Sequence, residues 1–181
     1  MTHNPLNDDL TPLQVGLTDW QQGDYTLAIR EIFVADTWDG AQLSVITDPV
    51  HGLVVITQTC DIVNDSSGKE WVTVCPLVGG NEQLCSEAAT GRTPAFATLE
   101  TPTNPRLVVD LGRMMSLHKD VLARLPRRRG FVTDLNRSRF AAALERKHGR
   151  FAFPDKFSVQ VLGRLVPVRP RPPSAGLSDL V

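Results

Sequence analysis

The spacing of apolar residues changes part-way along the chain, and this change constrains the fold more than any other feature. Before residue 111, short segments are wholly apolar or alternate apolar with polar residues, as β-strands do. Two later segments place apolar residues about every 3.6 positions, as amphipathic helices do. Strands followed by helices are typical of an α+β fold, so we expect a small curled antiparallel sheet or barrel capped by C-terminal helices.

Turn signals separate the expected strands. Residues 25–34 and 41–47 flank the pair Asp39-Gly40, which favours a hairpin because both residues tolerate positive φ. The run LVVIT at 53–57 is the expected central strand, and residues 70–78 form the next. Residues 80–105 are rich in Thr, Pro, Gly and Ala, which predicts a long loop, with a short strand near 95–99 as the alternative for that part.

Two helices are expected after the strands. In the first, near residues 116–125, Ser116 can cap the start and Pro126 ends the helix. The second is expected at 134–148, directly after a Thr-Asp pair that suits an N-terminal cap.

The expected domain organisation is simple. Residues 1–20 are polar and contain two prolines, which predicts an irregular lead-in. A single domain is expected over 21–168, ending in a strand-like run at 157–168. The proline-rich stretch 169–181 has no composition that would fold alone, so it is expected to be a tail.

Composition fits a soluble cytoplasmic protein. The chain has 181 residues, of which 41% are apolar and 22% charged, and no stretch approaches 18 consecutive apolar residues. The N-terminus lacks the basic-then-apolar layout of a secretory signal. Three cysteines without a CxxC pair favour a reducing compartment.

Charge is unevenly distributed. Residues 1–118 carry fifteen acidic and five basic side chains, whereas residues 119–150 carry ten basic and three acidic ones. The basic segment contains candidate nucleic-acid-binding residues Arg124, Arg127, Arg128, Arg129, Arg137 and Arg139. Arginine suits phosphate geometry, which favours RNA or another nucleic acid as a partner. The alternative is a solvated face that pairs with the acidic part of the chain.

The polar cluster after the central strand is a candidate catalytic site. Cys60 could act as a thiolate nucleophile, with His118 or His51 as the base and Asp61 orienting that base.

Two other interpretations of this cluster remain open. Cys60 could instead be a small buried residue beside a turn capped by Asp61. In a third interpretation, Gln58, Thr59 and Asp61 form the polar floor of a ligand site, in which Gln58 and Thr59 are candidate nucleic-acid-binding residues.

No metal or other cofactor is expected. The candidate ligands Cys60, Cys75, Cys85, His51 and His118 lack the paired spacing that structural zinc sites use.

Three segments, in order, resemble the MazF/PemK toxin family. GDYTLA (23–28) resembles the family's opening strand, HGLVVIT (51–57) is similar to its Arg-Pro-apolar-Val-Val-Leu-Ser strand, and WVTVCPL (71–77) resembles the strand that follows. The resemblance covers about residues 23–148. It implies an SH3-like barrel with a C-terminal helix, and a homodimer formed through the barrel and that helix.

The family cleaves mRNA without a metal, using an arginine and a Ser or Thr. In this chain His51 stands where the arginine would begin the strand, Gly52 replaces the proline, and Leu77 and Val78 stand where the hydroxyl is expected. Metal-free RNA cleavage needs a proton acceptor and a group that stabilises the developing phosphorane charge. His51 could act as acid or base, because its reference pKa lies near neutrality.

Three functions are therefore predicted as alternatives. The first is a MazF/PemK-like module that binds nucleic acid or a protein partner, such as an antitoxin or a defence component, in a toxin–antitoxin or phage-defence setting without the family's catalytic set. The second is a metal-free endoribonuclease that uses His51. The third is a cysteine-dependent hydrolase that uses Cys60 with His118 or His51.

Overall fold

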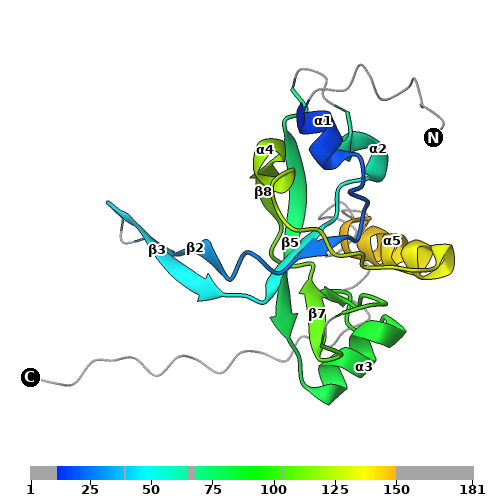
Figure 1. Cartoon of the computed structure of the whole chain (residues 1–181). Coiled ribbons are helices and arrows are strands. Elements are labelled where there is room, and N and C mark those ends of the chain that lie inside the picture. The colour runs from blue at the N-terminus through cyan, green and yellow to red at the C-terminus, as the bar shows by residue number, and fades with distance from the viewer. Residues whose placement is uncertain (1–11, 39, 65–67, 103, 150–181) are drawn as a thin grey trace, which may run out of the picture. The chain divides into compact units, whose positions relative to one another are not determined.

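The computed structural model describes residues 12–38, 40–64, 68–102 and 104–149. In these ranges the chain forms short helices and antiparallel strands, so the predicted α+β class is confirmed. Figure 1 shows β5 running through the centre, with α1, α2 and α4 gathered at one of its ends and α3 at the other. No helix in these ranges is both long enough and apolar enough to cross a membrane.

The main sheet has six strands, all paired antiparallel. Along the sheet they are β1 (Tyr25–Thr26), β4 (Gly52–Val55), β5 (Trp71–Gly79), β7 (Leu107–Asp110) and β6 (Phe96–Ala97), and β8 (Met115–His118) also pairs with β5. Strand β4 lies between β1 and β5 and is buried along its whole length, so the prediction of a central strand in this segment is confirmed.

The expected closed barrel is not confirmed. Strands β1 and β6 are the two ends of the pairing path, and within the described ranges no pairing joins them. The β7–β8 side of the sheet is irregular, because β7 pairs with β5 at Leu77–Gly79 and β8 pairs with it at Trp71–Val74, with a turn between them.

Both faces of this sheet are buried, which explains why its central strands are almost wholly apolar. Val54 belongs to one core cluster and its neighbours Leu53 and Val55 to the other, as expected when side chains alternate along a strand. Helix α5 (Asp134–His148) contributes Phe140 to the first cluster. The second cluster is covered by residues of α1 (Pro12–Leu17), α2 (Thr59–Ile62) and α4 (Lys119–Leu122), namely Leu17, Ile62 and Leu122.

The prediction that residues 1–20 are an irregular lead-in is wrong for the described part. Pro12–Leu17 is helix α1, and Leu17 and Trp20 are each 2% exposed in the second cluster. Residues 1–11, the predicted strand at 157–168 and the tail at 169–181 lie outside the described residues.

The second expected helix is confirmed and the first is corrected. Helix α5 spans Asp134–His148, and Thr133 caps it by accepting the Asn136 amide hydrogen. The helix expected near 116–125 is shorter, because Met115–His118 pairs with β5 as β8. Only Lys119–Leu122 is helical, and His118 rather than Ser116 accepts the capping hydrogen bond, from the Asp120 amide.

Residues 80–105 are not simply a loop, because they contain helix α3 (Glu82–Thr90). Asn81 caps its first turn through the Leu84 amide, and Gly91 ends it in the left-handed region at φ 71°. Both signals are visible in the sequence.

Strands β2 (Glu31–Trp38) and β3 (Leu43–Pro49) form a separate two-stranded sheet, so the predicted hairpin is confirmed. We call this pair the β arm. Gly40 adopts φ 93° between the two strands. In Figure 1 the β arm projects to the left, away from the main sheet.

Candidate functional site

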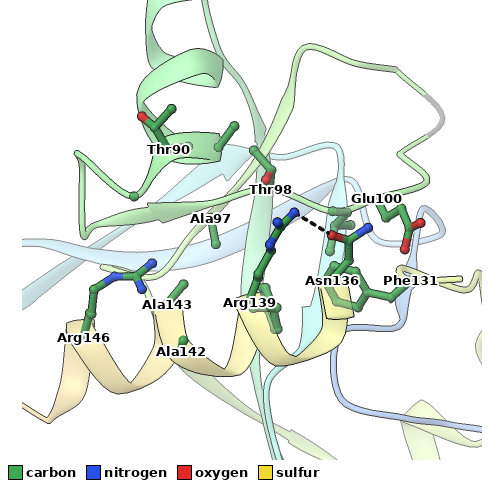
Figure 2. Close-up of a pocket in the computed structure, with 15 residues that line it drawn as sticks. Thr90, Ala97, Thr98, Glu100, Phe131, Asn136, Arg139, Ala142, Ala143 and Arg146 are labelled. Atoms are coloured by element: carbon green, nitrogen blue, oxygen red, sulfur yellow. Dashed lines mark hydrogen bonds between the residues drawn. The ribbon is translucent and has the colours of Figure 1, made fainter. Parts of the chain in front are cut away.

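A pocket of about 600 Å³ lies between α3, α5 and the segment around β6. We call it the α3–α5 pocket, and Figure 2 shows the residues that line it. Its apolar lining includes Ala88, Ala97, Leu99, Phe131, Phe140 and Ala143. Its polar lining includes Thr90, Thr98, Glu100, Asn136, Arg139 and Arg146. Apart from Ala143 these apolar residues are nearly fully buried, so the polar and charged side chains make up most of the accessible lining, and the two arginines favour an anionic ligand.

Helix α5 supplies both of the pocket's arginines. Arg139 and Arg146 are seven residues apart, so they lie on the same side of the helix about 10 Å apart along its axis. In Figure 2 both side chains extend from α5 toward the segment that carries Ala97 and Thr98. Arg139 donates to Asn136 Oδ1 at 3.2 Å, which orients the guanidinium while leaving most of its donors free.

Arg146 lies against the end of α3. A Cβ atom on Gly91 would lie 3.0 Å from Arg146 Nη2, so the guanidinium packs closely against this glycine. The carboxyl end of a helix carries partial negative charge, which favours a guanidinium there. The position of Arg146 therefore depends on both the left-handed turn at Gly91 and the electrostatics of α3.

Glu100 lies at the pocket edge near the start of α5. Its Oε2 accepts hydrogen bonds from the Val132 and Thr133 amides at 2.8 and 3.1 Å, and these bonds hold the pKa of the carboxyl below its usual value. The carboxylate is thus committed to backbone donors at the helix start. An anion in the pocket would be favoured toward Arg139 and Arg146 rather than toward Glu100.

Only one of the six arginines predicted to bind nucleic acid, Arg139, lines this pocket. Arg127 is used inside the protein, because its Nη1 donates to Asp24 Oδ2 at 2.8 Å and the Asp24 side chain is only 3% exposed. Arg128 and Arg129 have exposed side chains, and their backbones bond to Tyr25 and Thr101 respectively.

The last two predicted arginines also lie outside the pocket lining. Arg124 is exposed just after α4. Arg137 is half-buried on α5, and within the described ranges its buried Nε has no hydrogen-bond partner. Arg146 belongs to the same basic segment but is not among the six arginines predicted to bind nucleic acid, although its seven-residue spacing from Arg139 on a predicted helix is a signal for it.

The predicted cysteine site is not assembled. Cys60 is exposed on α2, and its Sγ lies 3.9 Å from Gln58 Oε1. Among the described residues, no hydrogen bond joins this thiol to an imidazole. His51 precedes β4 whereas Cys60 follows it, so the strand separates them, and His118 Nδ1 accepts the Asp120 amide as the cap of α4. The interpretation of Cys60 as a buried residue is wrong, because the side chain is exposed.

Asp61 contacts two lysines, one through its side chain and one through its backbone oxygen. It forms a salt bridge with Lys69 at 2.9 Å, and both side chains are nearly half exposed. The buried Lys119 donates from Nζ to the backbone carbonyl oxygens of Asp61, at 2.7 Å, and Asn64. This lysine therefore satisfies carbonyl groups at the end of α2 that the short helix leaves unpaired.

Gln58 and Thr59 do not line the α3–α5 pocket. Gln58 is the exposed residue that precedes α2, and Thr59 Oγ1 accepts the Gln22 amide at 3.1 Å. These contacts connect α2 to the segment before β1 and do not form the polar floor considered from sequence.

His51 is exposed, and the structure places a cation near it. Arg30 Nη1 lies 3.4 Å from the His51 backbone oxygen, because the β arm pairs Glu31 with Pro49 and brings Arg30 beside Val50. In this sequence His51 stands at the position compared with the MazF/PemK arginine. The register of the β2–β3 hairpin, which brings residue 30 beside residue 50, is a signal that could have indicated Arg30 as a nearby cation.

Two predictions remain, that Cys75 is a core residue and that no metal is bound. Burial raises the pKa of the Cys75 thiol to about 12, so at neutral pH this side chain is a neutral core residue. No group of three or more His, Cys, Asp or Glu side chains in the described part of the chain is arranged to hold a metal ion.

No protein-family model matches this chain, and no curated protein matches it in sequence.

Proposed function

We propose that this protein is a nucleic-acid-binding module that holds a single strand in the α3–α5 pocket. The observation that carries the proposal is the pair Arg139 and Arg146, which project from one side of α5 over an apolar lining. In this arrangement the guanidinium groups bind backbone phosphates. Phe131 and Phe140 are 3% and 2% exposed, so they support the pocket from the core and do not stack on a base.

The chemistry favours backbone contact over sequence recognition. Arginine reads bases through paired donors held against base edges, and the only amide side chain in the pocket, Asn136, already accepts from Arg139. The resemblance to MazF/PemK proteins favours RNA as the nucleic acid and a cytoplasmic toxin–antitoxin or phage-defence setting. The SH3-like barrel and an antitoxin-like or defence protein partner are part of the same proposal.

The test is fluorescence anisotropy with a labelled single-stranded RNA, titrated at several salt concentrations. Arg139→Glu and Arg146→Glu are compared with Arg106→Glu, which makes the same charge change at an exposed arginine outside the pocket lining. Each phosphate contact on a single strand contributes about −0.7 to the slope of log K against log salt. We expect each pocket variant to weaken binding and to flatten the slope by about that amount, and Arg106→Glu to leave the slope unchanged.

Two results would count against the proposal. One is wild-type protein that does not bind the RNA at low salt. The other is an Arg106→Glu variant that loses as much affinity and slope as the pocket variants, because binding would then follow net charge rather than this pocket. Circular dichroism checks that each variant is folded.

The same samples test the endoribonuclease alternative, which the position of Arg30 beside His51 favours. The proposal expects the RNA to be recovered intact after incubation without metal. Cleavage that disappears in His51→Ala and Arg30→Ala variants, while Arg139→Glu affects only binding, would instead assign catalysis to the base of the β arm.

A further inference from the structure

The β arm carries an exposed apolar face. Cross-strand partners share a face in an antiparallel pair, and Thr47, Val45 and Leu43 alternate to the same side of β3. Their partners on β2 are Phe33, Ala35 and Trp38, where an irregularity between Ala35 and Trp38 shifts the register by one residue. We call the side formed by these six residues the outer face.

The opposite side of the β arm is attached to the core at its base, whereas Ile46, which pairs with Val34 on that side, is 45% exposed. Ile32 is 5% exposed and belongs to the second core cluster, and Val34 packs against that cluster. Arg113 adds an ion pair to Asp48 on this side, which fixes the base of the β arm to the main sheet. Because the inner side is anchored, the outer face is held away from the core.

The outer face is unusually exposed for its composition. Phe33 is 82% exposed, Trp38 64%, Val45 55% and Leu43 51%. An isolated two-stranded hairpin is only marginally stable in water, and clusters of exposed large apolar side chains mark interaction surfaces. A partner that covers this face would stabilise the hairpin and would also remove the apolar side chains from water.

We propose that the outer face of the β arm binds the same face of a second copy of this chain, forming a two-fold symmetric dimer. None of the six outer-face residues is charged, and Glu31, which alternation places on the same side, lies beyond Phe33 at the base of the β arm. A nucleic acid would find no cation among these six residues, and the two charged side chains of β2, Glu31 and Asp36, are both acidic.

The order of side chains along the β arm suits a two-fold axis. Large aromatic residues, Phe33 and Trp38, lie at the two ends of the face, and the small Ala35 lies between them. When two β arms cross in opposite directions at Ala35, Phe33 of one copy meets the partner's Trp38. A self-complementary patch of this kind is what an isologous interface requires.

The available area predicts the strength of the dimer. Aromatic side chains bury about 150–250 Å² each, and aliphatic ones somewhat less. At their exposed fractions, the two aromatic and two aliphatic side chains of the outer face together offer roughly 500 Å² per copy. The pair would bury roughly 1,000 Å², which is below the roughly 1,200–2,000 Å² of stable specific interfaces and in the range of weak, transient ones. We therefore expect a weak dimer, with a dissociation constant in the micromolar range.

The experiment is analytical ultracentrifugation of the full chain over a dilution series. The wild type is expected to shift from the 19.9 kDa monomer toward twice that mass as concentration rises. Phe33→Asp is expected to keep the protein monomeric at every concentration. Ser44→Asp places the same charge on the neighbouring exposed position of β3, facing the other side, and is expected to dimerise like the wild type.

A cross-link provides a second measurement that does not depend on a new charge. In a background with Cys60→Ala and Cys85→Ser, Ala35→Cys is expected to give a disulfide-linked dimer under a mild oxidant, because the two copies approach most closely at this residue. Ser44→Cys in the same background is the control and is expected to stay unlinked.

Three outcomes would overturn the inference. The first is a wild type that stays monomeric up to its solubility limit. The second is a dimer that survives Phe33→Asp but is lost with substitutions on α5, which would place the interface on α5 instead. The third is equal cross-linking at positions 35 and 44.

Discussion

Replacement of Arg127 by alanine tests whether the basic segment is partly structural. The substitution removes the 2.8 Å contact with Asp24 and leaves the buried carboxylate with two backbone donors, the Gln21 amide at 3.0 Å and the Gly130 amide at 3.3 Å. The carboxylate stays almost completely buried while its only charged partner in the described structure disappears.

The expected cost follows from that geometry. A hydrogen bond to a charged group contributes about 1.5–3 kcal/mol, and removing one partner of a fully buried ion pair costs about 3–5 kcal/mol. The Arg127 side chain is 27% exposed, so solvent already screens part of the pair. We therefore expect a loss of about 2 kcal/mol, which lowers the melting temperature of a domain this size by about 4–8 °C.

Arg128→Ala is the matched control. The Arg128 side chain is exposed, and its backbone bonds with Tyr25 do not depend on the side chain. Its free energy of unfolding, measured with urea and circular dichroism, is expected to stay within about 0.5 kcal/mol of the wild type. A double-mutant cycle with Asp24→Asn is expected to show that Arg127→Ala costs less once the carboxylate is neutral.

The reasoning would be refuted if Arg127→Ala were as stable as the wild type. It would also be refuted if Arg127→Ala and Arg128→Ala destabilised the protein equally, because the effect would then follow charge number rather than the contact with Asp24.

Two further predictions concern buried positions. Gly23→Ala is expected to cost at least about 2 kcal/mol, because Gly23 has φ 90° and a Cβ there would lie 2.2 Å from the Phe131 ring, whereas Gly40→Ala at φ 93° meets no atom within 4 Å and is expected to cost about 1 kcal/mol. Urea unfolding compares the two variants, and equal losses would show that backbone strain alone is responsible. At pH 8, iodoacetamide followed by mass spectrometry is expected to label exposed Cys60 but not Cys75, whose pKa is raised to about 12 by burial. Labelling of Cys75 without denaturant would contradict its place in the core.

Several elements could be predicted because their signals are local. The run at 53–57 is apolar at every position but the last, and its first three residues belong to a strand that is buried on both faces. Helix α5 carries its capping residue and its apolar spacing within sixteen residues, and both operate without distant partners. The hairpin around Gly40 likewise depends on neighbouring residues.

Other elements depended on contacts that the local pattern does not contain. Residues 116–118 fall within the helix predicted near 116–125, yet Met115–His118 forms β8 because the edge of β5 at Trp71–Val74 offers backbone groups that must be paired. The segment before residue 20 is polar on average, yet Leu17 and Trp20 are buried because the second face of the sheet needs a cover.

The candidate site shows the same division. The amino-acid sequence by itself determined that arginines are concentrated after residue 118 and that some of them lie on a helix. It could not separate Arg127 from Arg139, because the difference is a carboxylate that lies 103 positions earlier in the chain. Whether a side chain is free to bind a ligand depends on which distant groups the fold brings within hydrogen-bonding distance, and only the packed chain specifies those groups.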